Sequence, residues 1–139
     1  MCYCDAETPS FINQTFPKAA KTHFCGECGV AIRANTRYER SSGLWGGDFN
    51  SYVRCMECRD LNRFMHWWSR QSDGCYCEVF EDLGEAVQEE WRGGQAKLIG
   101  IAYVAFLRRG YRDREERMAD YARRRAERAA KKLAQQHVE

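Results

Sequence analysis

Eight cysteines constrain this 139-residue chain more than any other feature, because they fall into four close pairs. In chain order the pairs are Cys2 with Cys4, Cys25 with Cys28, Cys55 with Cys58, and Cys75 with Cys77. Zinc is typically held in closed tetrahedral sites by four soft ligands such as cysteine thiolates. The paired cysteines therefore predict two four-cysteine sites and two bound Zn²⁺ ions.

The spacing within each pair predicts its local geometry. A C-x-x-C pair is typical of a knuckle, a tight turn in which two sulfurs converge on one ion, and Gly26 and Gly29 allow the positive φ angles of such turns. A C-x-C pair in an extended strand places both cysteines on one face. We expect Cys25, Cys28, Cys55 and Cys58 to form one site, and Cys2, Cys4, Cys75 and Cys77 to form the other. An interleaved arrangement, in which the first pair joins the third and the second joins the fourth, stays open.

Cysteine pairs also serve in disulfides, redox motifs and iron–sulfur clusters. A disulfide framework also uses eight cysteines, but the N-terminus shows no signal-peptide pattern, so we expect a cytosolic location with reduced thiols. A redox role for a C-x-x-C pair is disfavoured, because no βαβ pattern surrounds either C-x-x-C motif. An iron–sulfur cluster is a competitor, because its ligands are also thiolates, and His23 is a candidate replacement ligand. Eight cysteines for two ions leave no position open for water, so we expect structural rather than catalytic sites.

The rest of the first 92 residues predicts short strands and helices around these sites. Strands are expected over 30–33, 37–40 and 49–54, with Asn35 in the first turn and a break over 41–43. Apolar residues at helical spacing predict one helix after the second knuckle, through Leu61, Phe64, Met65 and Trp68. A second helix is expected through Phe80, Leu83, Val87 and Trp91, ending at a Gly93-Gly94 joint.

A basic, alanine-rich segment follows the joint. Residues 108–132 hold eleven Arg and Lys against five acidic residues, a net charge of +6. The sequence predicts one long helix or two in series over 96–136, with Gly100 and Gly110 as weak points. The expected fold class is therefore α+β: a small zinc-stapled antiparallel sheet with short helices, then a long C-terminal α-helix. We divide the chain into a zinc-binding head, 1–92, and a basic helical extension, 93–139.

Several motifs in the head resemble those of a group of small cysteine-rich proteins encoded by tailed phages. The resemblance lies in the His23–Arg33 stretch, the Arg37-Tyr-Glu-Arg40 strand, a Gly-x-Trp-x-Gly turn at 43–47 and the C-x-x-C and C-x-C elements. It covers roughly residues 1–92, and Ala34-Asn35 stands where those proteins usually have Pro-Gly. Most of the group has no assigned function. The resemblance implies a zinc-binding phage protein and little about its activity. For a phage protein, the cytosolic location expected above is the cytoplasm of the host cell.

The sequence favours a binding role over catalysis. It contains no phosphate-binding glycine loop and no nucleophile–base signature, so we expect no enzyme. The longest near-apolar run, 98–107, is far shorter than the roughly 20 residues of a membrane span. One hypothesis is an anti-CRISPR-like counter-defence protein that binds and inhibits a host protein or ribonucleoprotein complex. The alternative is direct binding of DNA or RNA phosphates.

Both hypotheses use the basic extension, and both leave the oligomeric state open. The candidate partner-binding residues are Arg117, Arg123, Arg124, Arg125, Arg128, Lys131 and Lys132. The interspersed acids weaken the nucleic-acid hypothesis, because they favour pairing within the helix. A structural role in the virion is a third hypothesis, which no motif specifically favours.

Overall fold

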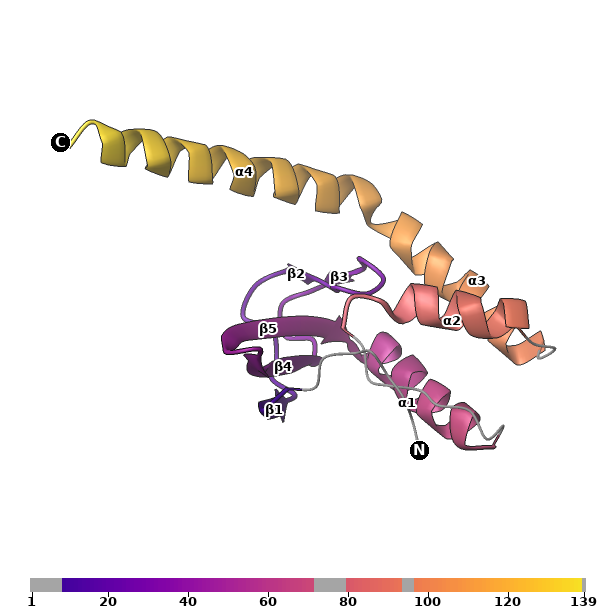
Figure 1. Ribbon diagram of the computed structural model, residues 1–139. Helices are drawn as coiled ribbons and strands as arrows, with labels where there is room; N and C mark the ends of the chain where they lie inside the picture. Colours follow the sequence, from indigo (N-terminus) through magenta and orange to yellow (C-terminus); the bar gives the residue numbers. More distant parts are fainter. Residues whose placement is uncertain (1–8, 72–79, 94–96, 139) are drawn as a thin grey trace.

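A computed structural model describes residues 9–71, 80–93 and 97–138 of the chain. It has an α+β fold with a small antiparallel sheet, short helices and a long C-terminal helix, which confirms the predicted fold class. In Figure 1 the helix α4 (Arg114–Gln136) extends over the strands β2 (His23–Phe24) and β3 (Ala31–Ile32), then continues past them to the C-terminus. The short helices gather at the other end of the molecule (Figure 1).

The larger sheet has three antiparallel strands in the order β1 (Phe11–Thr15), β4 (Tyr38–Trp45) and β5 (Asp48–Cys55). Gly46 and Gly47 connect β4 to β5 with φ angles of 56° and 89°. Two consecutive positive φ angles are typical of the tight turns that suit the twist of a hairpin. β5 ends at a cysteine, so this hairpin carries the second C-x-x-C pair to the edge of the sheet.

The break predicted over 41–43 is wrong, because β4 runs through it without interruption. Ser41 is buried and lies opposite Gln14 of β1 and Tyr52 of β5. A Cβ atom on Gly43 would lie 2.4 Å from the carbonyl oxygen of Phe11. The glycine therefore does not end the strand. It lets β1 approach β4 closely.

β2 and β3 form a separate two-stranded antiparallel sheet. The predicted strand over 30–33 is shortened to Ala31–Ile32, and it pairs with His23–Phe24. Asn35 follows with a φ of 66°, the left-handed conformation expected for the turn before β4. The first C-x-x-C pair lies between β2 and β3, so this small hairpin is the frame of the first knuckle.

The helices follow the predicted apolar periodicity with two differences. α1 (Met56–Gln71) begins in the second knuckle, and its predicted apolar residues face the core, with Met65 fully buried. α2 (Leu83–Gly93) buries Leu83 and Val87 completely, but Trp91 is 44% exposed. Phe80 precedes α2 and stacks on Tyr52 of β5, with ring centroids 4.8 Å apart.

The helix α3 (Lys97–Arg112) contributes Ile99 and Phe106 to the same hydrophobic core as the sheet and α1. α4 contributes no buried residue. The division of the chain after residue 92 stays a prediction, but the burial pattern shows that α3 belongs to the core and that α4 is the element that projects. Within the described residues, no helix is long and apolar enough to cross a membrane.

The long helical segment bends at Asp113 and not at either predicted glycine. Gly100 and Gly110 lie inside α3, at places where a Cβ atom would meet the Trp91 indole at 2.8 Å and the Cys28 carbonyl oxygen at 3.0 Å. These glycines therefore allow close packing. The bend occurs where the Asp113 side chain bonds to the head, as described below.

Candidate metal centre

Four cysteines from two distant parts of the chain meet in the core. The sulfur atoms of Cys25, Cys28, Cys55 and Cys58 all lie within 4.8 Å of one another. Their residues are between 0% and 8% exposed, and none of the four forms a disulfide. This group is the second and third pair of the sequence, so the expected pairing for this site is confirmed and the interleaved arrangement is wrong for these residues.

Backbone hydrogen bonds shape the first knuckle. The Gly29 amide donates to the Cys25 carbonyl oxygen at 2.9 Å, and the Cys25 amide donates to the Val30 carbonyl oxygen at 2.9 Å. Gly29 has a φ of 78°, as expected for a turn that folds back at this position. The Gly26 amide donates to the Val53 carbonyl oxygen at 2.8 Å, which fixes the first knuckle against β5 and hence against the second pair.

Amide groups also point at the sulfur atoms. The amides of Glu27 and Cys55 lie 3.4 Å and 3.3 Å from the Cys25 sulfur, and the Cys58 amide lies 3.4 Å from the Cys55 sulfur. An N–H donor stabilises a thiolate relative to a thiol, because it bonds more strongly to the charged form. The backbone is thus arranged for ionised sulfur ligands.

Protons are distributed unevenly within this buried group when no cation is present. Hydrogen bonds from the Cys28 thiol, then from those of Cys55 and Cys58, hold the pKa of Cys25 far below its usual value. The hydrogen bond to Cys25 raises the pKa of Cys58 far above its usual value. Four neighbouring sulfurs cannot all ionise in a buried site by themselves, so a cation is needed to bring them all to the thiolate form.

Arg109 of α3 supplies a positive charge at the edge of this group. Its guanidinium lies 3.8 Å from the Cys58 sulfur and 3.4 Å from the carboxylate of Glu57. Burial alone would lower the pKa of Arg109, but electrostatic attraction and hydrogen bonds to the sulfurs of Cys58 and Cys28 together outweigh burial and raise it. The sequence reasoning missed this role, because Arg109 stands in a run of basic residues 51 positions beyond Cys58.

Glu27, inside the first knuckle, also has a role that its position alone did not reveal. Its buried carboxylate accepts hydrogen bonds from Arg54 at 3.0 Å and from the amides of Glu81 and Leu83 at 2.8 Å and 2.9 Å. Arg54 is itself buried and also donates to Glu39 at 3.3 Å. The Glu27 side chain therefore connects the first knuckle to β5 and to the start of α2.

The first turn of α4 is bonded to the first knuckle. The Ala31 amide donates to the Asp113 carboxylate at 2.9 Å, and the Arg117 guanidinium lies 3.5 Å from the Cys28 carbonyl oxygen. Arg33 pairs with both oxygens of the Glu116 carboxylate. Polar contacts between residues 28–33, which include β3, and the first turn of the helix therefore fix the start of α4 against the head.

The sulfur spacing fits a single metal ion. Four thiolates placed tetrahedrally at about 2.3 Å from Zn²⁺ lie about 3.8 Å from one another. The sulfurs of Cys28 and Cys55 are 3.8 Å apart. With all four positions filled by buried cysteines, such a site has no coordination position for water or substrate, so its chemical capacity is structural.

The other predicted site residues have different outcomes. Cys2, Cys4, Cys75 and Cys77 lie outside the described residues. His23 is not part of the cysteine group in the described structure, and its ring instead packs on Tyr38 with centroids 5.3 Å apart. Burial lowers the pKa of His23, and the nearby charges of Lys21, Arg40 and Arg124 lower it further.

The candidate partner-binding residues all lie on α4 but in different environments. Arg117 lies against the knuckle, and Arg123 and Arg124 pair with Asp120, the latter at 2.8 Å. The remaining four, Arg125, Arg128, Lys131 and Lys132, are exposed. The pairing predicted between acidic and basic residues of this helix is thus found in its middle turns.

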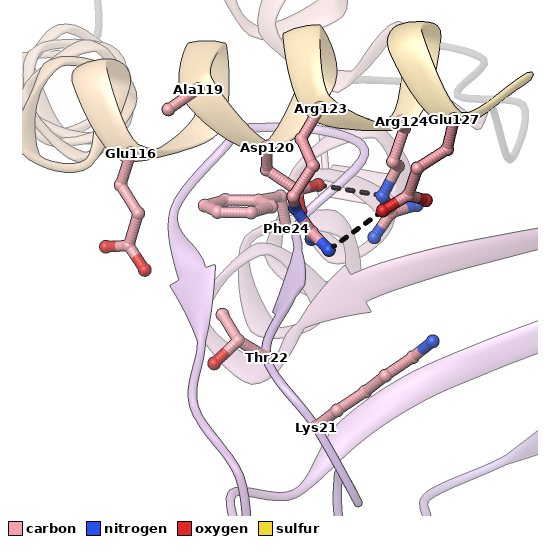
Figure 2. A pocket seen from close by; sticks show the side chains of 9 residues that line it. All are labelled: Lys21, Thr22, Phe24, Glu116, Ala119, Asp120, Arg123, Arg124 and Glu127. Carbon is pink, nitrogen blue, oxygen red and sulfur yellow. Dashed lines mark hydrogen bonds and ion pairs between the residues drawn. The ribbon is translucent and has the colours of Figure 1, made fainter. Parts of the chain in front are cut away.

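A cavity of about 620 Å³ lies between α4 and the segment that contains β2. Figure 2 shows Phe24 beneath the helix, with Asp120, Arg123, Arg124 and Glu127 reaching down beside it. Four of the charged side chains in this cavity pair with one another, since Arg123 also lies 3.5 Å from Glu127. The cavity therefore lacks a set of like charges that would select a ligand.

Comparison with known proteins leaves the centre to be interpreted from its own geometry. No protein-family model matches the chain, and neither the curated proteins nor the solved structures give a significant match.

Proposed function

We propose that this chain is a non-catalytic, zinc-binding interaction protein that uses α4 to bind an anionic surface of a host protein or ribonucleoprotein complex. One observation carries this proposal. α4 buries none of its 23 residues, although its first turn is bonded to the head. A long helix held at one end and left uncovered along its length is suited to binding another molecule.

Zinc is the ion that this proposal assigns to the described centre. Four sulfurs within 4.8 Å of one another enclose one ion and leave no room for the bridging sulfides of a multi-iron cluster. Zn²⁺ accepts four thiolates in tetrahedral geometry without a demand from its d-electrons. The proposal keeps a second Zn²⁺ at Cys2, Cys4, Cys75 and Cys77, which metal counting tests.

The charges on α4 support an anionic partner. Asp113 and Glu116 bond to the head, and Asp120 pairs with Arg123 and Arg124. Arg125, Arg128 and Lys132 follow one another at i, i+3 and i+7, which places them on one face of the helix. These three acids are therefore engaged elsewhere, and Arg125, Arg128 and Lys132 place three positive charges together on an exposed face.

Inhibition of a host complex rests on the resemblance to tailed-phage proteins alone. A small protein without catalytic groups acts most simply by occupying a surface that another molecule needs. A complex that carries guide RNA has both anionic RNA and protein surfaces, so it provides the type of target that the basic face of α4 fits.

Direct nucleic-acid binding is the second candidate function, and the same basic face favours it. Phosphate contacts from Arg125, Arg128 and Lys132 would give an affinity that falls steeply as salt increases. Titration of labelled duplex DNA and single-stranded RNA at two salt concentrations tests this candidate. Absence of binding at the lower salt concentration removes it.

A pull-down from host lysate with charge-reversed variants tests the main proposal. We expect the double variant Arg125→Glu, Arg128→Glu to lose the proteins that the wild-type chain captures. The matched control is Arg63→Glu, Arg70→Glu, which makes the same charge change at exposed positions of α1. The proposal fails if both double variants capture the same proteins as the wild type.

A further inference from the structure

A second surface, separate from α4, lies along α3. A groove of about 900 Å³ is lined by Trp91 of α2 and by residues of α3 that include Ile101 and Val104. These three side chains are 44%, 66% and 41% exposed. On the opposite side of α3, Ile99 and Phe106 are buried in the core. α3 is therefore apolar on two sides, and only one of them is covered by the described residues.

The length of the groove suits a helical ligand. Its α3 wall runs from Lys97 to Arg109, twelve residues apart. At 1.5 Å per residue, this wall is about 18 Å long, or just over three helical turns. Amphipathic helices bind apolar grooves through residues at i, i+3 or i+4, and i+7, which cover a similar length.

The charges at the two ends of the groove indicate the sign of the charge that a bound helix should carry. Arg109 is engaged with Glu57 and Cys58. Lys97 and Arg108 are exposed, and neither forms an ion pair with any of the described residues. Two cationic side chains without an ion pair, one at each end of an apolar groove, complement a helix that has acidic residues beside its apolar face.

A second copy of this chain does not supply such a helix from its described part. α2 is rich in glutamate, but its apolar residues Leu83 and Val87 are completely buried. α4 is exposed, but its accessible face is basic and would be repelled by Lys97 and Arg108. Since neither α2 nor α4 of a second copy fits the groove, the proposal assigns the complementary helix to a different protein.

We propose that the groove between α2 and α3 binds an acidic amphipathic helix of a partner protein, with apolar side chains on Trp91, Ile101 and Val104 and carboxylates at Lys97 and Arg108. This site does not involve α4, so it adds a second binding surface to the function proposed above. Two separate surfaces would let the protein hold a partner at two points, which increases the overall affinity.

Selection from a library of displayed 16-residue helical peptides against the full chain tests this proposal. We expect the enriched peptides to carry apolar residues at i, i+3 or i+4, and i+7, together with a net negative charge. The Kd of one enriched peptide is then measured by fluorescence anisotropy. Ile101→Glu is expected to weaken its binding by about tenfold or more, as at a central interface residue. Leu133→Glu on α4 is the matched control, because this leucine is similarly exposed at 58%.

A separate variant tests whether Lys97 and Arg108 select acidic peptides. The double variant Lys97→Glu, Arg108→Glu is expected to reject the acidic peptide and to enrich basic peptides in a repeated selection. The proposal is overturned by the enrichment of basic or uncharged peptides on the wild type, by no enrichment, or by equal binding to wild type and Ile101→Glu. A wild-type dimer that Ile101→Glu makes monomeric in sedimentation would also overturn it, because the groove would then bind a second copy.

Discussion

The amide of Ala31 donates a 2.9 Å hydrogen bond to the carboxylate of Asp113, 82 residues further along the chain. Asp113 occupies the N-cap position of α4, yet its side chain makes no capping bond to that helix. The carboxylate instead joins strand β3, next to the first knuckle, to the place where the long helix bends. The hairpin that carries the first cysteine pair and the direction of α4 are therefore physically connected.

Loss of this carboxylate should loosen the connection without unfolding the head. In Asp113→Ala, the Ala31 amide loses its acceptor, so we expect its hydrogen exchange to become about tenfold faster, the equivalent of about 1.4 kcal/mol. Amide exchange measured by NMR on the metal-loaded protein checks this expectation. Glu115→Ala is the control, because Glu115 is exposed in the same turn. Unchanged exchange at Ala31 in Asp113→Ala would show that the bond does not hold α4 to the hairpin.

Removal of the buried carboxylate of Glu27 should strongly destabilise the head. In Glu27→Ala, Arg54 loses one of its acidic partners while it remains buried, and two amides near α2 lose their acceptor. We expect the free energy of unfolding to fall by about 3 kcal/mol or more. Urea denaturation of the metal-loaded protein measures this change.

Glu57→Ala provides the comparison for the Glu27 variant. The Glu57 side chain is 64% exposed, and without it Arg109 keeps its contact with the Cys58 sulfur, so the loss of Glu57 should cost about 1 kcal/mol or less. Equal effects of the two substitutions would contradict the role assigned to the buried network.

The four-cysteine cluster was predictable from sequence because the spacing within each pair is local. The turn within each C-x-x-C pair brings the two sulfurs of that pair together. Only the question of which two cysteine pairs share one site was left open. The roles of Glu27, Arg109 and Asp113 were not predictable in this way. Each depends on a contact with a residue 27 or more positions away, and no periodic pattern marks such contacts.

The same distinction explains the errors in secondary structure. Ser41, Ser42 and Gly43 have the composition of a turn, yet pairing with strands on both sides keeps them extended. Gly110 has a low helix propensity, but close packing against the Cys28 carbonyl oxygen favours glycine there. In both places a tertiary contact outweighs the local preference of the residues.

Substitution of Gly43 should disturb the three-stranded sheet. In Gly43→Ala the new Cβ atom would lie 2.4 Å from the Phe11 carbonyl oxygen, so β1 must shift away from β4. We expect a loss of about 1–3 kcal/mol in the free energy of unfolding. The neighbouring Ser42→Ala removes only a hydroxyl contact with Ser51 and should cost about 1 kcal/mol or less. Thermal melting of both variants decides the matter, and a smaller effect of Gly43→Ala would count against the close approach of β1.

The pKa of His23 should lie below its ordinary value of 6.5, chiefly because burial disfavours the charged form and then because Lys21 and other cations repel that form. The unfolded chain consequently binds more protons at this residue in mildly acidic solution. The stability that neutral His23 contributes is fully present above pH 6.5 and is lost as the pH falls through the folded pKa. NMR titration of the imidazole should show a lowered pKa that rises in Lys21→Ala. A folded-state value at or above 6.5 would be contrary to this environment.

Metal removal tests the central claim that ions hold the head in its folded form. We expect elemental analysis of the purified chain to find two zinc ions per molecule, and one or fewer in Cys58→Ser. A strong chelator should abolish the cooperative thermal transition of the wild type, because binding energy at such sites is coupled to folding. A metal-free chain that keeps the same cooperative transition in chelator would contradict this account.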